Sequence, residues 1–391
     1  MPFHPVRIFS AAGLAALLVL AVCEGGAREP AMVHLARVPA GGLQPQAALD
    51  RQGVLHLIYL AGDPAAADIY YVRKGPHDAD FSVPLRVNSQ SGSAIALGTI
   101  RGAQIAIGRA GRVHVAWNGS RTAQPQGPGG ATPMLYSRLN ESGTAFEPQR
   151  NVIQAAYGLD GGGSLAADSK GGVFVFWHAP VPGTQGETNR AVWIARSYDD
   201  GSTFARETRA WSEPTGACGC CGMRAMAGED GTLYALYRAA TGGVDRDTVL
   251  LVSRDRGTTF RGTRVHPWKL NACPMSSAFL APVKGGALAA WETEKQVYFA
   301  RADERTLRVT TPVAAPGEGS RKHPVMAVNA AGDTILVWTE GTGWKKGGSL
   351  RWQVFDSSGA TKAESGVAPG VSAWSLAAVY PRPDGGFTIL Y

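Results

Sequence analysis

The stretch Gly171-Gly172-Val173-Phe174-Val175-Phe176-Trp177 decides the fold, because its pattern repeats along the chain. A glycine begins it, an apolar run rich in β-branched and aromatic residues follows, and a large aromatic residue stands six positions after the glycine. Such a run beside a turn residue is typical of a buried β-strand. Seven glycine–aromatic pairs share this offset: Gly53/Tyr59, Gly111/Trp117, Gly171/Trp177, Gly231/Tyr237, Gly285/Trp291, Gly332/Trp338 and Gly385/Tyr391.

Each unit contains further strand-like runs around this stretch. A short run of small residues such as Ser164–Ala167 precedes most of the glycines, an apolar run such as Val192–Ala195 follows, and a weaker fourth run comes after it. Units of about 50 residues with four short strands predict a β-propeller, because one blade cannot bury both of its faces alone. Small residues suit the strand nearest the axis, and aromatic residues suit the wider space between sheets.

The ends of the chain predict how the ring closes. The seventh unit stops at Tyr391, after its second strand, while the segment Met32–Arg37 precedes the first unit and has no place in it. We expect this segment to complete the last blade, so that N- and C-terminal strands close the ring. The fold class is therefore all-β, with six or seven four-stranded blades, depending on how the composite unit is built.

Composition agrees with a single turn-rich domain over residues 28–391. The 391 residues include 50 glycines and 24 prolines without a triplet period, which favours many tight turns and excludes collagen. The net charge of +7 is spread over the chain, with no basic run, so we expect no nucleic-acid partner. We expect a monomer that takes a small ligand.

The N-terminus has the features of a signal peptide. Arg7 precedes a twelve-residue apolar run, Ala11–Val22, which is too short to span a bilayer, and small residues follow it. We predict a signal peptide over residues 1–27 and a periplasmic or secreted protein. Leu20-Ala21-Val22-Cys23 resembles a bacterial lipobox that departs from the pattern at Val22. Lipidation of Cys23, which would make an outer-membrane lipoprotein, is the alternative.

Two hairpins carry a family resemblance. Ser197–Phe204 and Ser253–Phe260 share the pattern Ser-x-Asp-x-Gly-x-Thr-Phe. This pattern resembles the Asp-box, or BNR repeat, of the sialidase superfamily. In such a turn the aspartate accepts hydrogen bonds from backbone amides, the glycine is left-handed and the aromatic packs into the blade. The resemblance implies a propeller of sialidase type and a structural role for eight residues: Ser197, Asp199, Gly201, Phe204, Ser253, Asp255, Gly257 and Phe260.

Sialidase chemistry itself is only partly supported by the sequence. Members of the superfamily resemble one another in an arginine triad, an aspartate acid/base and a Tyr–Glu nucleophile pair. The first inner strand here, Gly42–Ala47, lacks the arginine expected in the first blade. Arg101, Arg224 and Arg321 stand near the start of other inner strands, where they could grip an anion together or lie in water at the rim. The candidates for nucleophile parts are Tyr380, Glu292, Glu294 and Glu340, and nothing in their spacing pairs them.

The cysteines form the most specific cluster. Cys218, Cys220 and Cys221 precede the inner strand of the fourth unit and Cys273 precedes that of the fifth, so neighbouring loops can bring four sulfur atoms together. The arrangement resembles a subgroup of exported Asp-box propellers with a Cys-x-Cys-Cys stretch. The further residues of that resemblance are Tyr237-Arg238, Arg246-Asp247, Trp268 and Cys273-Pro274. No particular activity follows from it.

Three interpretations of the cysteine cluster stay open. Two disulfides are the first, and Cys218–Cys221 with Cys220–Cys273 is the preferred pairing, because a Cys220–Cys221 bond would close a strained ring. A copper or zinc site, in which Met223, Met275 and His323 could join the thiolates, is the second. Redox-active thiols are the third.

The favoured function is binding of a carbohydrate-like or anionic ligand at the axial mouth of the propeller. The candidate ligand-binding residues are Arg101, Arg224, Arg238, Arg321, His323 and Trp268. Two alternatives stay open. One is a sialidase-type glycoside hydrolase with a rearranged site, and the other is a periplasmic protein that handles copper or zinc.

Overall fold

The repeated stretch is the second strand of each blade. The computed structural model describes residues 1–4 and 32–391, and the predicted signal peptide and Cys23 lie almost wholly outside them. Six sheets have four antiparallel strands in chain order. From the inner to the outer strand, the first three are β2 (Leu43–Leu49), β3 (Leu55–Asp63), β4 (Ala66–Lys74) and β5 (Leu85–Arg86); β6 (Gln104–Ile107), β7 (Val113–Asn118), β8 (Met134–Arg138) and β9 (Arg150–Asn151); and β10 (Ser164–Ala167), β11 (Val173–Pro180), β12 (Arg190–Ser197) and β13 (Thr208–Arg209). The next three are β14 (Arg224–Ala227), β15 (Leu233–Arg238), β16 (Thr248–Ser253) and β17 (Arg261–His266); β18 (Ala278–Val283), β19 (Gly286–Thr293), β20 (Gln296–Asp303) and β21 (Val313–Ala314); and β22 (Arg321–Val328), β23 (Thr334–Glu340), β24 (Gly348–Phe355) and β25 (Thr361–Val371).

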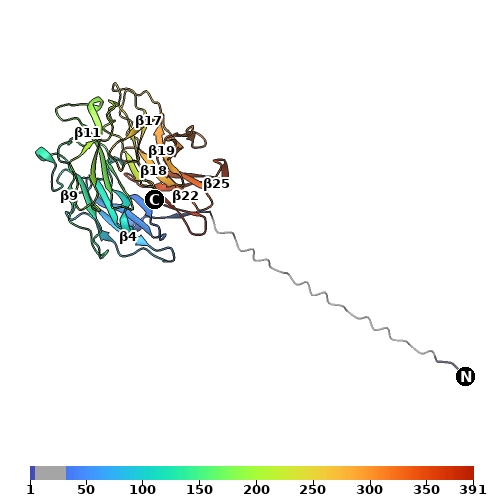
Figure 1. Ribbon diagram of the computed structural model, residues 1–391. Coiled ribbons are helices and arrows are strands. Elements are labelled where there is room, and N and C mark those ends of the chain that lie inside the picture. Colours follow the sequence, from blue (N-terminus) through green and yellow to red (C-terminus); the bar gives the residue numbers. More distant parts are fainter. Residues whose placement is uncertain (5–31) are drawn as a thin grey trace. The chain divides into compact units, whose positions relative to one another are not determined.

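The seventh blade closes the ring as predicted. It contains β26 (Ala378–Pro381), β27 (Phe387–Leu390) and the N-terminal strand β1 (Val33–Ala36), which pairs with β27 in parallel, with Leu35 opposite Ile389. The ring therefore has seven blades, and the last has three strands instead of four because the N-terminal segment supplies only one. In Figure 1 the first strands, in blue, lie beside the last strands, in red, near the C-terminus.

Helical structure in the described residues is limited to four short 3₁₀ turns. They are η1 (Pro39–Gly41), η2 (Arg109–Gly111), η3 (Pro128–Gly130) and η4 (Glu187–Asn189). None of the helices in this part of the chain has the length and apolar character of a membrane span.

Small residues line the axis, and aromatic residues fill the space between blades. The inner strands surround a channel of about 380 Å³ whose walls include Ala47, Ala106 and Ala166. Repeat aromatics such as Trp117 and Trp177 are fully buried. The inner strand of the last blade starts later than the predicted run Ser375–Ala378, because the backbone turns at Trp374 before the strand begins.

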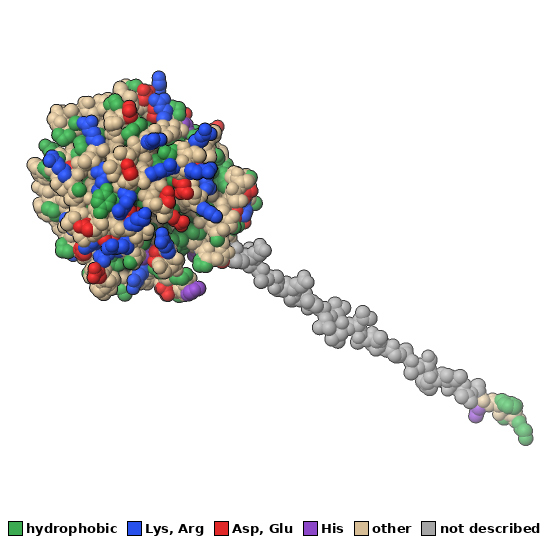
Figure 2. Space-filling view, viewed as in Figure 1, with side chains coloured by type: hydrophobic (Ala, Val, Ile, Leu, Met, Phe, Trp, Pro, Cys, Tyr) green, Lys and Arg blue, Asp and Glu red, His purple; other side chains and the backbone are tan. Residues whose placement is uncertain are grey.

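The antiparallel order of the strands gives the ring two different ends. The loops that lead into the inner strands, which we call lead-in loops, lie at one end with the loops between second and third strands. We call this end the mouth. The turns between first and second strands and between third and fourth strands lie at the opposite end. On the face that Figure 2 shows, basic and acidic side chains are interspersed.

The two Ser-x-Asp hairpins lie at the end opposite the mouth, and their hydrogen bonds match. The Asp199 carboxylate accepts bonds from the Ser197 hydroxyl at 2.7 Å and the Thr203 amide at 2.9 Å. Asp255 accepts the corresponding bonds in the next blade. Burial would raise the pKa of Asp199, but the Thr203 and Ser197 bonds outweigh it and lower that pKa to about 2. These side chains stabilise turns far from the mouth.

Candidate functional site

Several non-glycine residues at the mouth have a left-handed backbone. Five of them are Gln44 (φ 51°), Thr99 (φ 58°), Met275 (φ 46°), His323 (φ 54°) and Trp374 (φ 63°). Each lies in a lead-in loop or in the first residues of an inner strand. Such backbone costs on the order of 1–3 kcal/mol per residue and clusters at functional sites, where the surrounding structure holds it in place. The cluster therefore marks the mouth as the candidate functional surface.

Hydrogen bonds across the mouth hold these residues. The His323 imidazole lies between the hydroxyls of Thr99 and Thr339, with 2.8 Å to each. The amide nitrogen of the Gln44 side chain donates to the backbone carbonyl of Trp374 at 2.9 Å. The Thr99–His323 and Gln44–Trp374 bonds connect segments more than 200 residues apart in the sequence. The mouth is thus a preformed surface built from loops of several blades.

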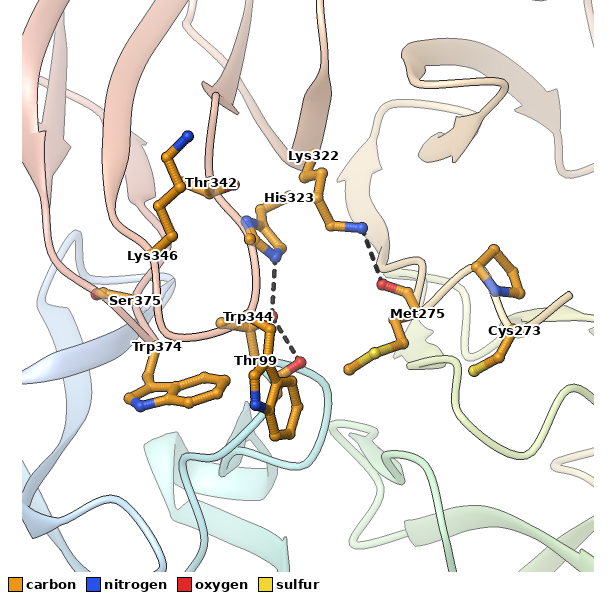
Figure 3. A pocket seen from close by; sticks show the side chains of 13 residues that line it. Thr99, Cys273, Met275, Lys322, His323, Thr342, Trp344, Lys346, Trp374 and Ser375 are labelled. Atoms are coloured by element: carbon orange, nitrogen blue, oxygen red, sulfur yellow. Dashed lines mark hydrogen bonds between the residues drawn. The ribbon is translucent and has the colours of Figure 1, made fainter.

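A pocket of about 220 Å³ opens among these loops, and we call it the tryptophan pocket (Figure 3). Trp344, which is 59% exposed, meets Trp374 edge-to-face with 4.5 Å between ring centroids. Gly98 allows the close approach of Met275 and Trp344, whose side chains both reach 3.4 Å from the point a Cβ would occupy. The complete lining is Gly98, Thr99, Cys273, Pro274, Met275, Lys322, His323, Thr342, Gly343, Trp344, Lys346, Trp374 and Ser375.

The charged groups of the pocket are basic. Lys322 forms an ion pair with buried Glu292, with 3.0 Å from Nζ to Oε2, whereas Lys346 has no carboxylate partner among the described residues. Burial lowers the pKa of His323 to about 4, so the imidazole is neutral at pH 7. No aspartate or glutamate is among the described residues that line the pocket. The pocket therefore favours an anion.

Arg224 places a second cation below the mouth, in the axial channel. Its guanidinium donates to Gln46 Oε1 at 2.9 Å and lies 5.5 Å from the ring centroid of Phe279. Burial lowers the pKa of Arg224 to about 10, which still leaves it charged at neutral pH. No carboxylate in the described part of the chain pairs with it, and it is the only charged residue that lines the channel there.

The other two candidate arginines of the anion grip, Arg101 and Arg321, are paired with carboxylates of the protein itself. Arg101 pairs with Asp160 at 2.8 Å. Arg321 is buried, pairs with Glu340 at 3.1 Å and donates to the carbonyls of neighbouring loops. The structure therefore does not bring Arg101, Arg224 and Arg321 together into one anion grip.

Arg238 and Trp268 form a contact of their own behind the mouth. The buried Arg238 guanidinium donates to the Ser276 hydroxyl at 2.7 Å and to the Arg246 carbonyl, and it lies 4.9 Å from the Trp268 ring centroid. Neither residue lines the tryptophan pocket. Of the six candidate ligand residues, His323 lines this pocket and Arg224 lines the axial channel, and both residues also border a small cavity of about 30 Å³.

The glutamates and the tyrosine considered for a Tyr–Glu nucleophile pair do not pair with one another, and Glu292 and Glu340 are held by other side chains. Glu292 accepts bonds from the Ser277 amide and hydroxyl and from the His323 amide, in addition to the Lys322 ion pair. Glu340 is held by two arginines. Tyr380 lines the channel. Glu294 has a positive φ of 54° in the turn before β20. The structure pairs none of these glutamates with Tyr380.

The cysteine cluster is confirmed in position and only half confirmed in pairing. Cys220 and Cys273 form a disulfide between adjacent lead-in loops, as predicted. The second predicted disulfide is not formed: Cys218 and Cys221 are buried thiols with 2.8 Å between their sulfur atoms. The Cys218 sulfur also lies 3.5 Å from that of Cys220.

The donor set does not fit the predicted copper or zinc site in this oxidation state. The sulfur atoms of Cys218, Cys220 and Cys221 lie within 4.8 Å of one another. A disulfide sulfur is not a thiolate, however, so Cys220 and Cys273 cannot act as thiolate ligands while they are bonded to each other. The His323 nitrogens are also occupied, since both contact threonine hydroxyls.

Several residues of the mouth escaped the sequence analysis. Thr99 and Lys346 belong to loops without a repeated motif, so their proximity could not be predicted from the sequence. A signal did exist for Trp344 and Trp374, because neither stands at the aromatic position of a repeat. Trp344 also follows Gly341-Thr342-Gly343, a combination typical of an exposed loop.

These features define the class of protein as a seven-bladed β-propeller with a preformed pocket at its mouth. Neither the protein-family models nor the curated proteins include a match. Solved structures do match at low identity, and at this level they show the fold alone. The "Hadza microbial sialidase Hz136" is 15% identical, over 81% of this chain and 69% of that one, with a TM-score of 0.51.

Two further structures support the same fold. A protein of unknown function from Dyadobacter fermentans is 12% identical, over 84% of this chain and 94% of that one, with a TM-score of 0.52. The alpha-L-arabinanase of Penicillium chrysogenum, solved with arabinobiose, is 12% identical, over 83% and 96%, with a TM-score of 0.50. The fold of this chain is thus a β-propeller similar to those of this sialidase and this arabinanase.

Proposed function

We propose that this chain is an exported propeller that binds a carbohydrate-like, anionic ligand in the tryptophan pocket. The observation that carries the proposal is the pair Trp344 and Trp374, which meet in a pocket whose charged lining residues are Lys322 and Lys346. Indole rings offer a broad apolar face beside a polar N–H group. A sugar ring has the complementary character, with C–H groups on its faces and hydroxyls on its edge.

The size and polarity of the pocket support a ligand of about monosaccharide size at this point. Its volume of about 220 Å³ equals the space of roughly seven water molecules in the liquid. Thr342 and Ser375 add hydroxyl groups to the aromatic wall. A few polar groups on an aromatic wall are typical of small-molecule sites.

Charge supports an acidic ligand over a neutral one. Lys346 has no carboxylate partner in the described part of the chain, and Arg224 supplies a second such cation in the channel below. A single exposed ion pair contributes about 0.2–1 kcal/mol, or up to about fivefold in affinity. A stacked tryptophan contributes more, on the order of 2 kcal/mol, or about thirtyfold.

We expect the pocket to bind its sugar without hydrolysing a glycosidic bond. Hydrolysis by the common mechanism needs two carboxyl groups that flank the scissile bond. No carboxylate is among the described residues lining the pocket or the channel. Glu292 lies nearby, but its oxygens are occupied by Lys322 and by the hydrogen bonds that hold Ser277 and His323.

Isothermal titration calorimetry with oligosaccharides tests the proposal. Trigalacturonate and 3′-sialyllactose are compared with galactotriose and lactose as neutral counterparts. We expect at least one acidic sugar to bind several-fold more tightly than its counterpart.

Two matched pairs of variants locate the binding. Trp344→Ala is expected to weaken it about thirtyfold, while Tyr198→Ala removes an aromatic of similar exposure (51%) at the opposite end and leaves it unchanged. Lys346→Ala is expected to weaken it up to about fivefold, and Lys170→Ala to leave it unchanged. Equal affinities for acidic and neutral sugars would contradict the proposal, and so would equal effects of Trp344→Ala and Tyr198→Ala.

A further inference from the structure

The four cysteines form a disulfide and a neighbouring pair of thiols, and this arrangement offers reactivity beyond a structural bridge. One disulfide, Cys220–Cys273, lies in contact with a pair of reduced thiols, Cys218 and Cys221. Thiol–disulfide exchange needs a thiolate within reach of a disulfide sulfur. The 3.5 Å between the sulfur atoms of Cys218 and Cys220 is a van der Waals contact, with no atom between them that the exchange would have to displace.

We propose that this cluster is a thiol–disulfide exchange centre, in which the Cys218/Cys221 dithiol and the Cys220–Cys273 disulfide interconvert. The inference does not depend on the identity of the pocket ligand. It rests on the three sulfur atoms that lie within 4.8 Å of one another and on the exposed position of Cys273.

The local charges maintain one thiolate within the dithiol. Burial alone would raise the pKa of Cys221, but the Cys218 thiol, the Arg238 charge and the Ser276 hydroxyl outweigh it and lower that pKa to about 7. The hydrogen bond to Cys221 raises the pKa of Cys218, so the proton of the pair lies on Cys218. Cys221 therefore supplies a thiolate, 2.8 Å away, that can accept this proton.

The first step follows from these positions. The reactive form is the less populated one, in which the proton has moved across the 2.8 Å contact from Cys218 to Cys221. In this form the Cys218 sulfur attacks the Cys220 sulfur. A Cys218–Cys220 bond forms, the Cys220–Cys273 bond breaks, and its electron pair leaves on the Cys273 sulfur. Direct attack by Cys221 on Cys220 is disfavoured because it would close a strained ring between adjacent residues.

The second step restores the favourable Cys-x-x-Cys pairing. Cys221 releases the proton that it accepted in the first step, and its sulfur attacks Cys218. A Cys218–Cys221 bond forms, the Cys218–Cys220 bond breaks, and Cys220 leaves as a thiolate that takes up the released proton. Two thiols and one disulfide are present before and after, so the exchange needs no external oxidant or reductant. Its product frees Cys273, which is exposed and lines the tryptophan pocket, to react with an external disulfide.

Cysteine mapping under nitrogen tests the exchange. The mature protein is brought to two thiols per chain and incubated in the folded state with N-ethylmaleimide, which traps exposed thiols. After acid denaturation, an isotopically distinct maleimide labels the remaining thiols, and peptides are mapped by mass spectrometry. We expect the first label on Cys273 and accumulation of a Cys218–Cys221 disulfide. Labels confined to Cys218 and Cys221, with Cys220–Cys273 intact, would overturn the proposal.

Two variants separate the steps. Cys218→Ser removes the attacking sulfur and should abolish the label on Cys273. Cys221→Ser keeps the attacking Cys218 sulfur but removes the group that accepts its proton and the attacker of the second step. It should therefore yield label on Cys273 more slowly than the wild type, together with a Cys218–Cys220 disulfide. Cys273 label in Cys218→Ser equal to that in the wild type would also refute the mechanism. If either variant fails to fold, the wild-type map alone decides.

Discussion

Removal of the Cys220–Cys273 bridge should measurably destabilise the ring. The double substitution Cys220→Ser/Cys273→Ser removes both sulfur atoms, so that neither is left to form a new pair. Cys220 is half-buried and Cys273 is exposed, so the lost packing is small. The effect on stability should come mainly from the cross-link itself.

The magnitude follows from the length of chain that the bridge closes. The two cysteines are separated by 53 positions. The chain-entropy model assigns such a loop about 14 cal/mol/K, or about 4 kcal/mol at 25 °C. Measured values commonly fall below this model, so we expect a loss of about 2–4 kcal/mol in the free energy of unfolding.

Urea unfolding is the appropriate assay. The urea dependence of stability increases with chain length, and for a ring of this size we take a slope of roughly 3 kcal/mol/M. The midpoint should therefore fall by about 1 M in the double variant. Tryptophan fluorescence and circular dichroism should give the same midpoint if the ring unfolds as one unit.

A reductant supplies the matched control. Dithiothreitol should lower the midpoint of the wild type to that of the variant and leave the variant unchanged. Equal midpoints for the wild type and the variant without reductant would contradict this prediction. They would mean that the bridge is not closed in solution or does not restrict the unfolded chain.

Three further predictions concern the buried carboxylate, the ring closure and catalysis. Glu292→Gln should cost about 3–5 kcal/mol in urea unfolding, because it leaves Lys322 without its buried partner. Burial would raise the pKa of Glu292, but the Lys322 charge and the His323 and Ser277 bonds outweigh it and hold that pKa below its usual range. The contribution of ionised Glu292 to the free energy of unfolding is therefore complete above the unfolded pKa of about 4.3 and is lost as pH falls through the lower, folded pKa. The stability of Glu292→Gln should accordingly depend less on pH in that window. Truncation after Pro381 removes β27, the strand between β26 and β1, and should abolish cooperative thermal unfolding; a truncated chain with the wild-type melting temperature would contradict the closure. A fluorogenic sialic-acid substrate should show no turnover above the blank, and hydrolysis that Glu292→Gln abolishes without unfolding the protein would restore the glycosidase alternative.

The sequence predicts the ring because the signals for it are local. The offset between each glycine and its aromatic residue depends on one turn and one strand, so Gly171 and Trp177 report the same structure as Gly231 and Tyr237. Closure by Met32–Arg37 could be predicted because the last unit lacked strands. The exact number of strands in that blade could not, since it depends on how many strands the N-terminal segment supplies, and this segment supplies only β1.

The mouth was harder to predict because long-range partners determine it. The position of Arg321 at the start of an inner strand suggested a ligand cation, but Glu340 on the adjacent strand neutralises it. The left-handed backbone of Thr99 and His323 depends on a contact between segments 224 residues apart. The cysteines were found correctly because their spacing within adjacent loops limits where the sulfur atoms can lie.

Binding in the tryptophan pocket is tested most directly by a crystal structure of the protein with the tightest-binding acidic oligosaccharide of the panel. We expect a sugar ring stacked on Trp344 or Trp374, with its carboxylate directed toward Lys346 or toward Arg224. An oligosaccharide bound on the outer strands or at the Asp199 end of the ring, with the tryptophan pocket empty, would contradict it.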